Sequence, residues 1–130
     1  MFREELERQS IRLICPEQCS LELNGDLQML TQVLINLVKN SSEALQQTKD
    51  PEIELSCFTD SSGHITISVR DNGHGIAGDK LDQVFVPFFS TREKGSGIGL
   101  SLCKQIIQLH RGKIQVSSSP GQGTTMIIQL

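Results

Sequence analysis

The 130-residue chain has no tryptophan, no tyrosine and only five phenylalanines. A protein that reads single-stranded nucleic acid by stacking bases on aromatic side chains is therefore a poor match. The formal charge is -3 and the isoelectric point about 5.6, which argues against a general binder of polyanions. No apolar run reaches the roughly 20 residues of a membrane span, and the charged start MFREELERQS does not resemble a signal peptide.

Neither cysteine nor histidine forms a metal-binding pattern. The four cysteines contain no CxxC pair, and the three histidines lie at no metal-ligand spacing from them. We therefore expect reduced thiols in a cytoplasmic domain, without a disulfide or a zinc site. His110, at the end of a predicted helix, is interpreted as a cation that complements the helix dipole.

The apolar pattern predicts one packed domain, with 37% hydrophobic and 21% charged residues. Asp26 is the predicted N-cap of a long helix, and Arg111-Gly112 is the predicted stop of a second one. Helices are predicted over 27–47, 79–84 and 98–110, a helical tail over 1–10, and strands over 11–15, 20–24, 52–59, 64–70, 113–119 and 124–130. This order predicts an α+β fold, a two-layer sandwich in which helices cover one face of a mixed, mostly antiparallel sheet.

Glycine is concentrated in two stretches, because eight of the eleven glycines fall within 73–99 and 121–123. The run Gly95-Ser-Gly-Ile-Gly99 leads directly into a predicted helix, whose first amides carry a partial positive charge. Such a loop suits a phosphate chain, although it matches neither the P-loop nor the dinucleotide fingerprint. On this stretch alone, a flexible loop that enters a helix explains the pattern equally well.

Polar residues elsewhere in the chain suit the other parts of a nucleotide. Asp71 follows a predicted strand, where its carboxylate can accept a hydrogen bond from an exocyclic amine such as that of adenine. Taken alone, this segment also fits a β-turn with an Asx-type hydrogen bond. Asn36 and Asn40 lie one helical turn apart, so their amide oxygens can hold Mg²⁺ beside phosphates, or they form a solvated polar face.

A Pro- and Gly-interrupted segment over 85–96 is predicted to be a long loop. Its adjacent Phe88 and Phe89 either close a core or anchor a mobile lid. Arg92 and Lys94 can reach phosphate oxygens from such a lid.

Together these motifs give a resemblance that covers about residues 20–130. The segments NLVKNSSEAL (36–45), DNGHGI (71–76), FVPFFSTR (85–92), GSGIGLSL (95–102) and GQGTT (121–125) are similar to an asparagine box, a first glycine box, a phenylalanine box, and second and third glycine boxes. The chain resembles the ATP-binding catalytic domain of bacterial two-component sensor histidine kinases. That family shares a superfamily with DNA gyrase, the ninety-kilodalton heat-shock chaperone and MutL. Five boxes in this order are a specific signal.

The resemblance implies a Bergerat-type ATP-binding fold with ATP and Mg²⁺ as cofactors. The resemblance implies that Asn40 is the Mg²⁺ ligand and that Asn36 supports the same site. It also implies that Asp71 accepts a hydrogen bond from the adenine amino group, and that Thr124 contributes to this contact through a water molecule. The other implied cofactor-binding residues are Gly73, Gly75, Ile76, Phe88, Gly95, Gly97, Gly99 and Leu100. The implied catalytic residues are Asn36, Asn40, Arg92 and Lys94.

Two positions depart from related patterns. Hydrolytic members of the superfamily carry a Glu four residues before the metal-binding Asn, whereas this chain has Asn36, which cannot take a proton at neutral pH. This favours phosphoryl transfer to a protein side chain. Many sensor kinases carry a Lys three residues after that Asn, whereas this chain has Glu43. We therefore expect Lys39, Arg92 or Lys94 to meet the phosphates.

The implied function is that of an ATP-dependent protein-histidine kinase, which donates a γ-phosphoryl group to a histidine on a separate dimerisation domain, with a response regulator downstream. Residues 1–19 are predicted to join such dimerisation helices, and residues 20–130 to form the catalytic domain. We expect this chain to bind ATP as a cytoplasmic monomer, without a nucleic-acid partner and without autophosphorylating alone. A membrane anchor in the parent protein is compatible with this expectation.

Three alternatives stay open at the level of sequence. An ATPase module whose cycle drives dimer closure is disfavoured by Asn36 and by a short lid. A serine kinase of the anti-sigma-factor type shares the boxes, although the stretch PFFSTREKGSGIGL looks closer to two-component kinases. A degenerate module that only docks partners is disfavoured by the intact glycine boxes.

Overall fold

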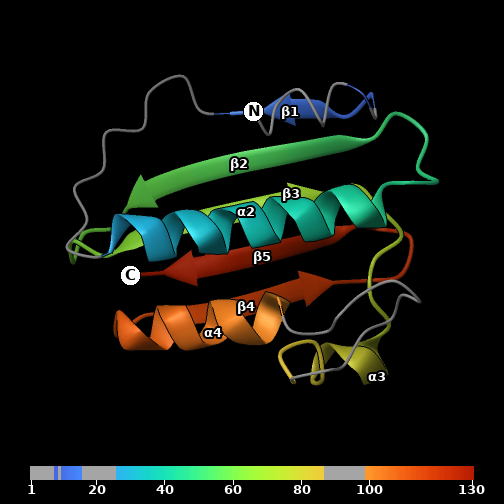
Figure 1. Cartoon of the computed structure of the whole chain (residues 1–130). Helices are drawn as coiled ribbons and strands as arrows, with labels where there is room; N and C mark the ends of the chain where they lie inside the picture. Colours follow the sequence, from blue (N-terminus) through green and yellow to red (C-terminus); the bar gives the residue numbers. More distant parts are fainter. Residues whose placement is uncertain (1–7, 9, 16–25, 87–98) are drawn as a thin grey trace.

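A computed structural model describes residues 8, 10–15, 26–86 and 99–130. Its elements are β1 (Arg12–Ile14), α2 (Leu27–Ala44), β2 (Glu52–Thr59), β3 (Ile65–Asp71), α3 (Gly78–Leu81), α4 (Gly99–Leu109), β4 (Lys113–Ser118) and β5 (Thr124–Gln129). Helices α2 and α4 lie side by side on one face of a five-stranded sheet (Figure 1). The predicted α+β sandwich is confirmed. The predicted strand over 20–24 and nearly all of the helical tail over 1–10 lie outside the described residues.

The sheet is mixed and mostly antiparallel. Its strands run in the order β1-β2-β3-β5-β4, and β1 is parallel to β2 while the other neighbours are antiparallel. Because β5 lies between β3 and β4, Thr124 pairs with Asp71 on one side and with Ser118 on the other. The topology thus brings Asp71 into one row with Ser118 and Thr124, which come from a distant part of the chain, at the end of the sheet.

The core fills the space between the two helices and the sheet. Its fully buried side chains come from both layers and include Val33 and Leu37 of α2, Ile107 of α4, and Ile53, Val69 and Ile128 of the sheet. Alternation in β3 and β5 places Asp71 and Thr124 on the same face as Val69 and Met126, the face that the helices cover. The polar row is therefore an extension of the core layer.

Both long helices begin or end close to their predicted limits. Asp26 caps α2 as expected, because its carboxylate accepts a hydrogen bond from the Met29 amide at 3.0 Å. Helix α2 ends three residues earlier than predicted, at Ala44. After α4, Arg111 takes the left-handed conformation (φ 60°). Gly112 is required for close packing, because a Cβ at this position would overlap the Gln129 carbonyl oxygen.

Among the described cysteines, Cys57 departs from the expectation of reduced thiols. Cys15 and Cys103 are free, whereas Cys57 is disulfide-bonded, so the expectation is wrong for Cys57. Among the described residues, no helix is long and apolar enough to cross a membrane.

His110 joins the end of α4 to the start of α2. Its Nε2 accepts a hydrogen bond from the Asp26 amide at 3.0 Å, and its Nδ1 lies 2.8 Å from the Ile106 carbonyl oxygen. A ring nitrogen that accepts a hydrogen bond carries no proton. Nε2 is therefore unprotonated, and Nδ1 carries the proton and donates a hydrogen bond to the Ile106 carbonyl oxygen. The sequence-based interpretation of His110 as a helix-end cation is therefore wrong, because the ring acts as a neutral tether between the helices.

Replacing His110 with alanine should lower the free energy of unfolding by about 1–2 kcal/mol, because both hydrogen bonds are lost and the Asp26 amide loses its partner. Urea unfolding at pH 8 measures the change. Leu109→Ala is the matched control, since Leu109 is adjacent and 72% exposed. Equal stabilities for the two variants would contradict the tether.

Candidate functional site

Asp71, at the end of β3, is a deeply buried ionisable group of the predicted site, with 4% of its surface exposed. Its carboxylate accepts hydrogen bonds from the Gly73 amide at 2.9 Å, the Ser41 hydroxyl and the Thr124 amide. Burial raises the pKa of Asp71, while these three donors and nearby His74 oppose the rise. The result is an oriented hydrogen-bond acceptor beneath the helix layer.

Helix α2 carries the second set of predicted residues. Asn36 and Asn40 are half-buried and lie one turn apart, and Asn40 immediately precedes Ser41, the partner of Asp71. The Asn36 side chain accepts a hydrogen bond from Gln32 at 3.4 Å and makes another with the Cys103 thiol of α4. The two asparagines and Ser41, which contacts the buried carboxylate, thus lie on the same helix.

The Cys103 thiol lies fully buried at the contact between the two helices. Burial raises its pKa to about 11, although the Asn36 hydrogen bond acts in the opposite direction. Cys103 therefore stays a neutral thiol near pH 7 and serves as a packing residue behind Asn36.

Three glycines, the predicted site residues Gly73 and Gly75 together with Gly123 of the third glycine box, stand where backbone segments pack closely around Asp71. A Cβ at Gly73 would lie 2.7 Å from the Ala44 carbonyl oxygen at the end of α2. Gly75 and Gly123 have positive φ, of 76° and 84°, and a Cβ there would overlap the carbonyl oxygens of Ser119 and Asp71 respectively. Each glycine is thus required by close packing of the protein's own loops.

Two residues of the site escaped the sequence analysis. The Asn72 side chain accepts a hydrogen bond from the Glu52 amide at 2.8 Å and donates one to the Asp50 carbonyl at 3.0 Å, so it holds the turn before β2. Ser118 contacts Ile76, Gly123 and Thr124 through its hydroxyl. The run DNGHGI contained Asn72, but no local pattern marked Ser118, whose partners come from other segments.

The structure therefore brings together part of the predicted site. Asp71, Gly73, Gly75, Ile76 and Thr124 meet at the ends of β3 and β5. Gly99 begins α4, and Leu100 is partly buried against the core. Lys39 is exposed on α2. Phe88, Phe89, Arg92, Lys94, Gly95 and Gly97 lie outside the described residues. Within the described part of the chain, no group of three His, Cys, Asp or Glu side chains forms a metal site.

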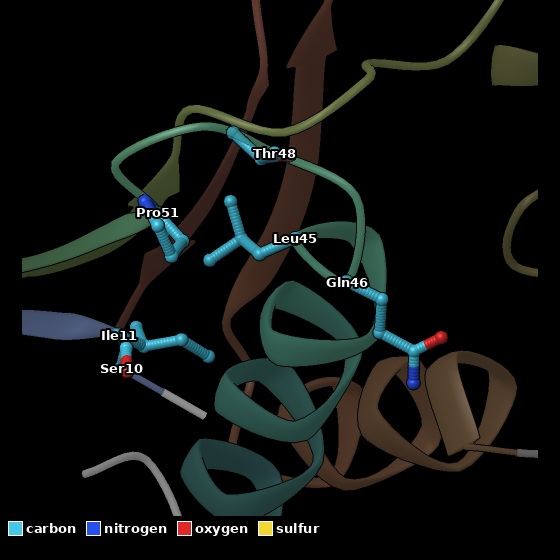
Figure 2. A pocket seen from close by; sticks show the side chains of 6 residues that line it. All are labelled: Ser10, Ile11, Leu45, Gln46, Thr48 and Pro51. Carbon is cyan, nitrogen blue, oxygen red and sulfur yellow. The ribbon is translucent and has the colours of Figure 1, made fainter. Parts of the chain in front are cut away.

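A cavity of about 530 Å³ lies at the turn between α2 and β2, beside the start of β1 (Figure 2). It is lined by Ser10, Ile11, Leu45, Gln46, Thr48 and Pro51. None of these is a predicted site residue, so this cavity is distinct from the cluster around Asp71.

Comparison with known proteins identifies the family. The model of the histidine kinase-, DNA gyrase B- and HSP90-like ATPases matches residues 25–130. The chain belongs to this family. Sporulation kinase C of Bacillus subtilis is 40% identical to this ATPase domain over 108 residues, which are 83% of this chain and 24% of that kinase. The domain thus spans about a quarter of the length of that relative.

Solved structures place the domain among histidine kinase catalytic domains. The catalytic domain of histidine kinase ThkA is 30% identical, with a TM-score of 0.84 over 99% of this chain and 84% of that one. A second ThkA structure, a complex with the response regulator protein TrrA, is 28% identical with a TM-score of 0.80 and covers 99% and 36% of the two chains. The resemblance predicted from the five boxes is confirmed, and so is the fold.

Gly123→Ala should destabilise the domain by about 2–4 kcal/mol, because a left-handed φ and an overlap with the Asp71 carbonyl both oppose a side chain. Gly78→Ala is the control: it has open space around it and begins α3, so its stability should stay the same or rise by about 0.5–1 kcal/mol. Thermal unfolding of both variants measures the difference. A Gly123→Ala variant as stable as Gly78→Ala would contradict the packing described.

Proposed function

We propose that this domain binds Mg²⁺-ATP and donates the γ-phosphoryl group to a histidine on a separate phosphoacceptor domain. The observation that carries the proposal is the buried Asp71 carboxylate, held by three donors beside Thr124. With those donors in place, the carboxylate keeps acceptor capacity for a ligand N–H group, which suits the exocyclic amine of adenine. Membership of the ATPase family supports the same ligand.

The phosphate end of the site requires a metal and positive charge. Mg²⁺ prefers oxygen ligands together with substrate phosphates, and the amide oxygen of Asn40 is such a ligand, with Asn36 beside it. Bound Mg²⁺ would neutralise charge on the transferring phosphoryl group. Asn40 suits the metal position because its neighbour Ser41 is hydrogen-bonded to Asp71. The base end and the phosphate end of one nucleotide can therefore contact the same part of α2.

The reaction favoured is phosphoryl transfer to a protein side chain. Neutral Asn36 occupies the place where hydrolytic members of the superfamily carry a general base, so it cannot activate water. Lys39, Arg92 and Lys94 stay the candidates for contact with the phosphates, and Lys39 is exposed on α2. A downstream response regulator is proposed by analogy with ThkA, which was solved with such a partner.

Calorimetric titration of ATP tests the proposal. Asp71→Asn should weaken binding about tenfold or more, because a charged acceptor is lost from a buried site. Asp50→Asn is the control, since Asp50 is exposed and only its backbone carbonyl takes part in the hydrogen bonds described above. Asn40→Ala should abolish the difference between titrations with Mg²⁺ and with a chelator. No ATP binding at millimolar concentration by the unmodified chain would overturn the proposal.

The raised pKa of Asp71 makes a separate pH prediction. Carboxyl carbon resonances, assigned with Asp71→Asn, should give a titration midpoint above the ordinary Asp value of 3.8. The folded state then holds this proton more tightly than the unfolded chain. Stability is therefore lost as pH rises from 3.8 through the folded pKa, and Asp71→Asn should remove that loss. A midpoint at or below 3.8 would show that the three donors outweigh burial.

A further inference from the structure

Ser118, the last residue of β4, connects three segments through one hydroxyl group. Its Oγ lies 2.8 Å from the Ile76 amide nitrogen, 2.8 Å from the Gly123 carbonyl oxygen and 2.9 Å from the Thr124 Oγ1. Strand register sets this arrangement, because Ser118 pairs with Thr124, which in turn pairs with Asp71. The half-buried hydroxyl is thus separated from Asp71, the candidate adenine contact, by the single strand β5.

The proton on each hydroxyl can be assigned by elimination. The Ile76 amide can only donate to Ser118, and the Gly123 carbonyl can only accept from it. Ser118 has a single proton, and the Gly123 carbonyl takes it. The contact between the two hydroxyls is then a hydrogen bond only if Thr124 donates to Ser118. Because its proton is used in this hydrogen bond, the Thr124 hydroxyl oxygen can only accept hydrogen bonds from any other partner.

This assignment gives the base end of the site two acceptors and no hydroxyl donor. Adenine presents an N–H donor at its exocyclic position, where guanine presents a carbonyl acceptor. At that position, a pair of acceptors, Asp71 and Thr124, suits the adenine amine, whereas the guanine carbonyl oxygen would meet only their lone pairs.

We propose that Ser118 is a positioning residue that fixes the Thr124 hydroxyl as an acceptor and thereby favours adenine over guanine nucleotides. The proposal rests on the proposed function, in which Asp71 accepts from the base, and it adds Thr124 as a second acceptor beside Asp71. It assigns to Ser118 no direct contact with the nucleotide. Its distinctive consequence is a change in base preference, which a purely structural residue would leave unaltered.

The test compares Mg²⁺-ATP and Mg²⁺-GTP affinities by calorimetry. Ser118→Ala frees the Thr124 hydroxyl to donate toward guanine, so the ATP-over-GTP affinity ratio should fall about fivefold. Ser118→Thr keeps a hydroxyl and should retain most of the preference. Ser117→Ala, an exposed neighbour on β4, should leave the ratio unchanged. Unfolding curves confirm that each variant is folded at the titration temperature.

A double-mutant cycle with Thr124→Val separates the proposal from a general effect on the loops. In that background Ser118→Ala should no longer alter the ratio, because the hydroxyl that Ser118 orients is absent. An unchanged ratio in folded Ser118→Ala, with ATP still bound, would overturn the proposal and leave the proposed function standing. A lowered ratio that persists unchanged in the Thr124→Val background would also overturn it. Failure of the unmodified chain to bind ATP would overturn both.

Discussion

The burial of one carboxylate governs the construction of the site. An ionised carboxyl taken out of water must regain its lost hydrogen bonds from the protein, and Asp71 regains them from the Gly73 amide, the Ser41 hydroxyl and the Thr124 amide. These donors come from a loop, a helix and a neighbouring strand, so all three must be held in register. Much of the surrounding geometry follows from that requirement.

The glycines around Asp71 are one consequence. Loops that supply amides to a buried group must approach each other more closely than a side chain permits, and Gly73 and Gly123 stand at two of those approaches. Ser118 and Asn72 serve the same end through their side chains, because they join the loops to each other and to the turn before β2. The helices are fixed in the same way, since His110 joins the end of α4 to the first turn of α2.

Sequence patterns predicted the features that depend on residues close together in the chain. The apolar spacing located α2 and α4 to within a few residues, and the five boxes identified the family. The patterns did not reveal Ser118, Asn72 or the role of His110, because each depends on partners 20 or more residues away or on a choice of tautomer. The same limit explains Cys57, whose disulfide is a tertiary contact. Motifs identified the residues beside Asp71, whereas their hydrogen-bond roles required the strand order β3-β5-β4.

The two ends of the candidate site face opposite electrostatic problems. A neutral base can be held by an anionic acceptor at little cost, which suits Asp71 at the strand ends. Phosphates are anionic and would be repelled by a second carboxylate. Two residues of α2 that are predicted to lie there, Asn36 and Asn40, are neutral amides, whereas Glu43 on the same helix is a carboxylate that such a site has to keep away from the phosphates. Helix α4 adds a partial positive charge at its start near Gly99. In a chain of net charge -3, the attraction for the proposed nucleotide would therefore be local, supplied by a helix terminus, the proposed cation and individual basic side chains rather than by the field of the whole domain.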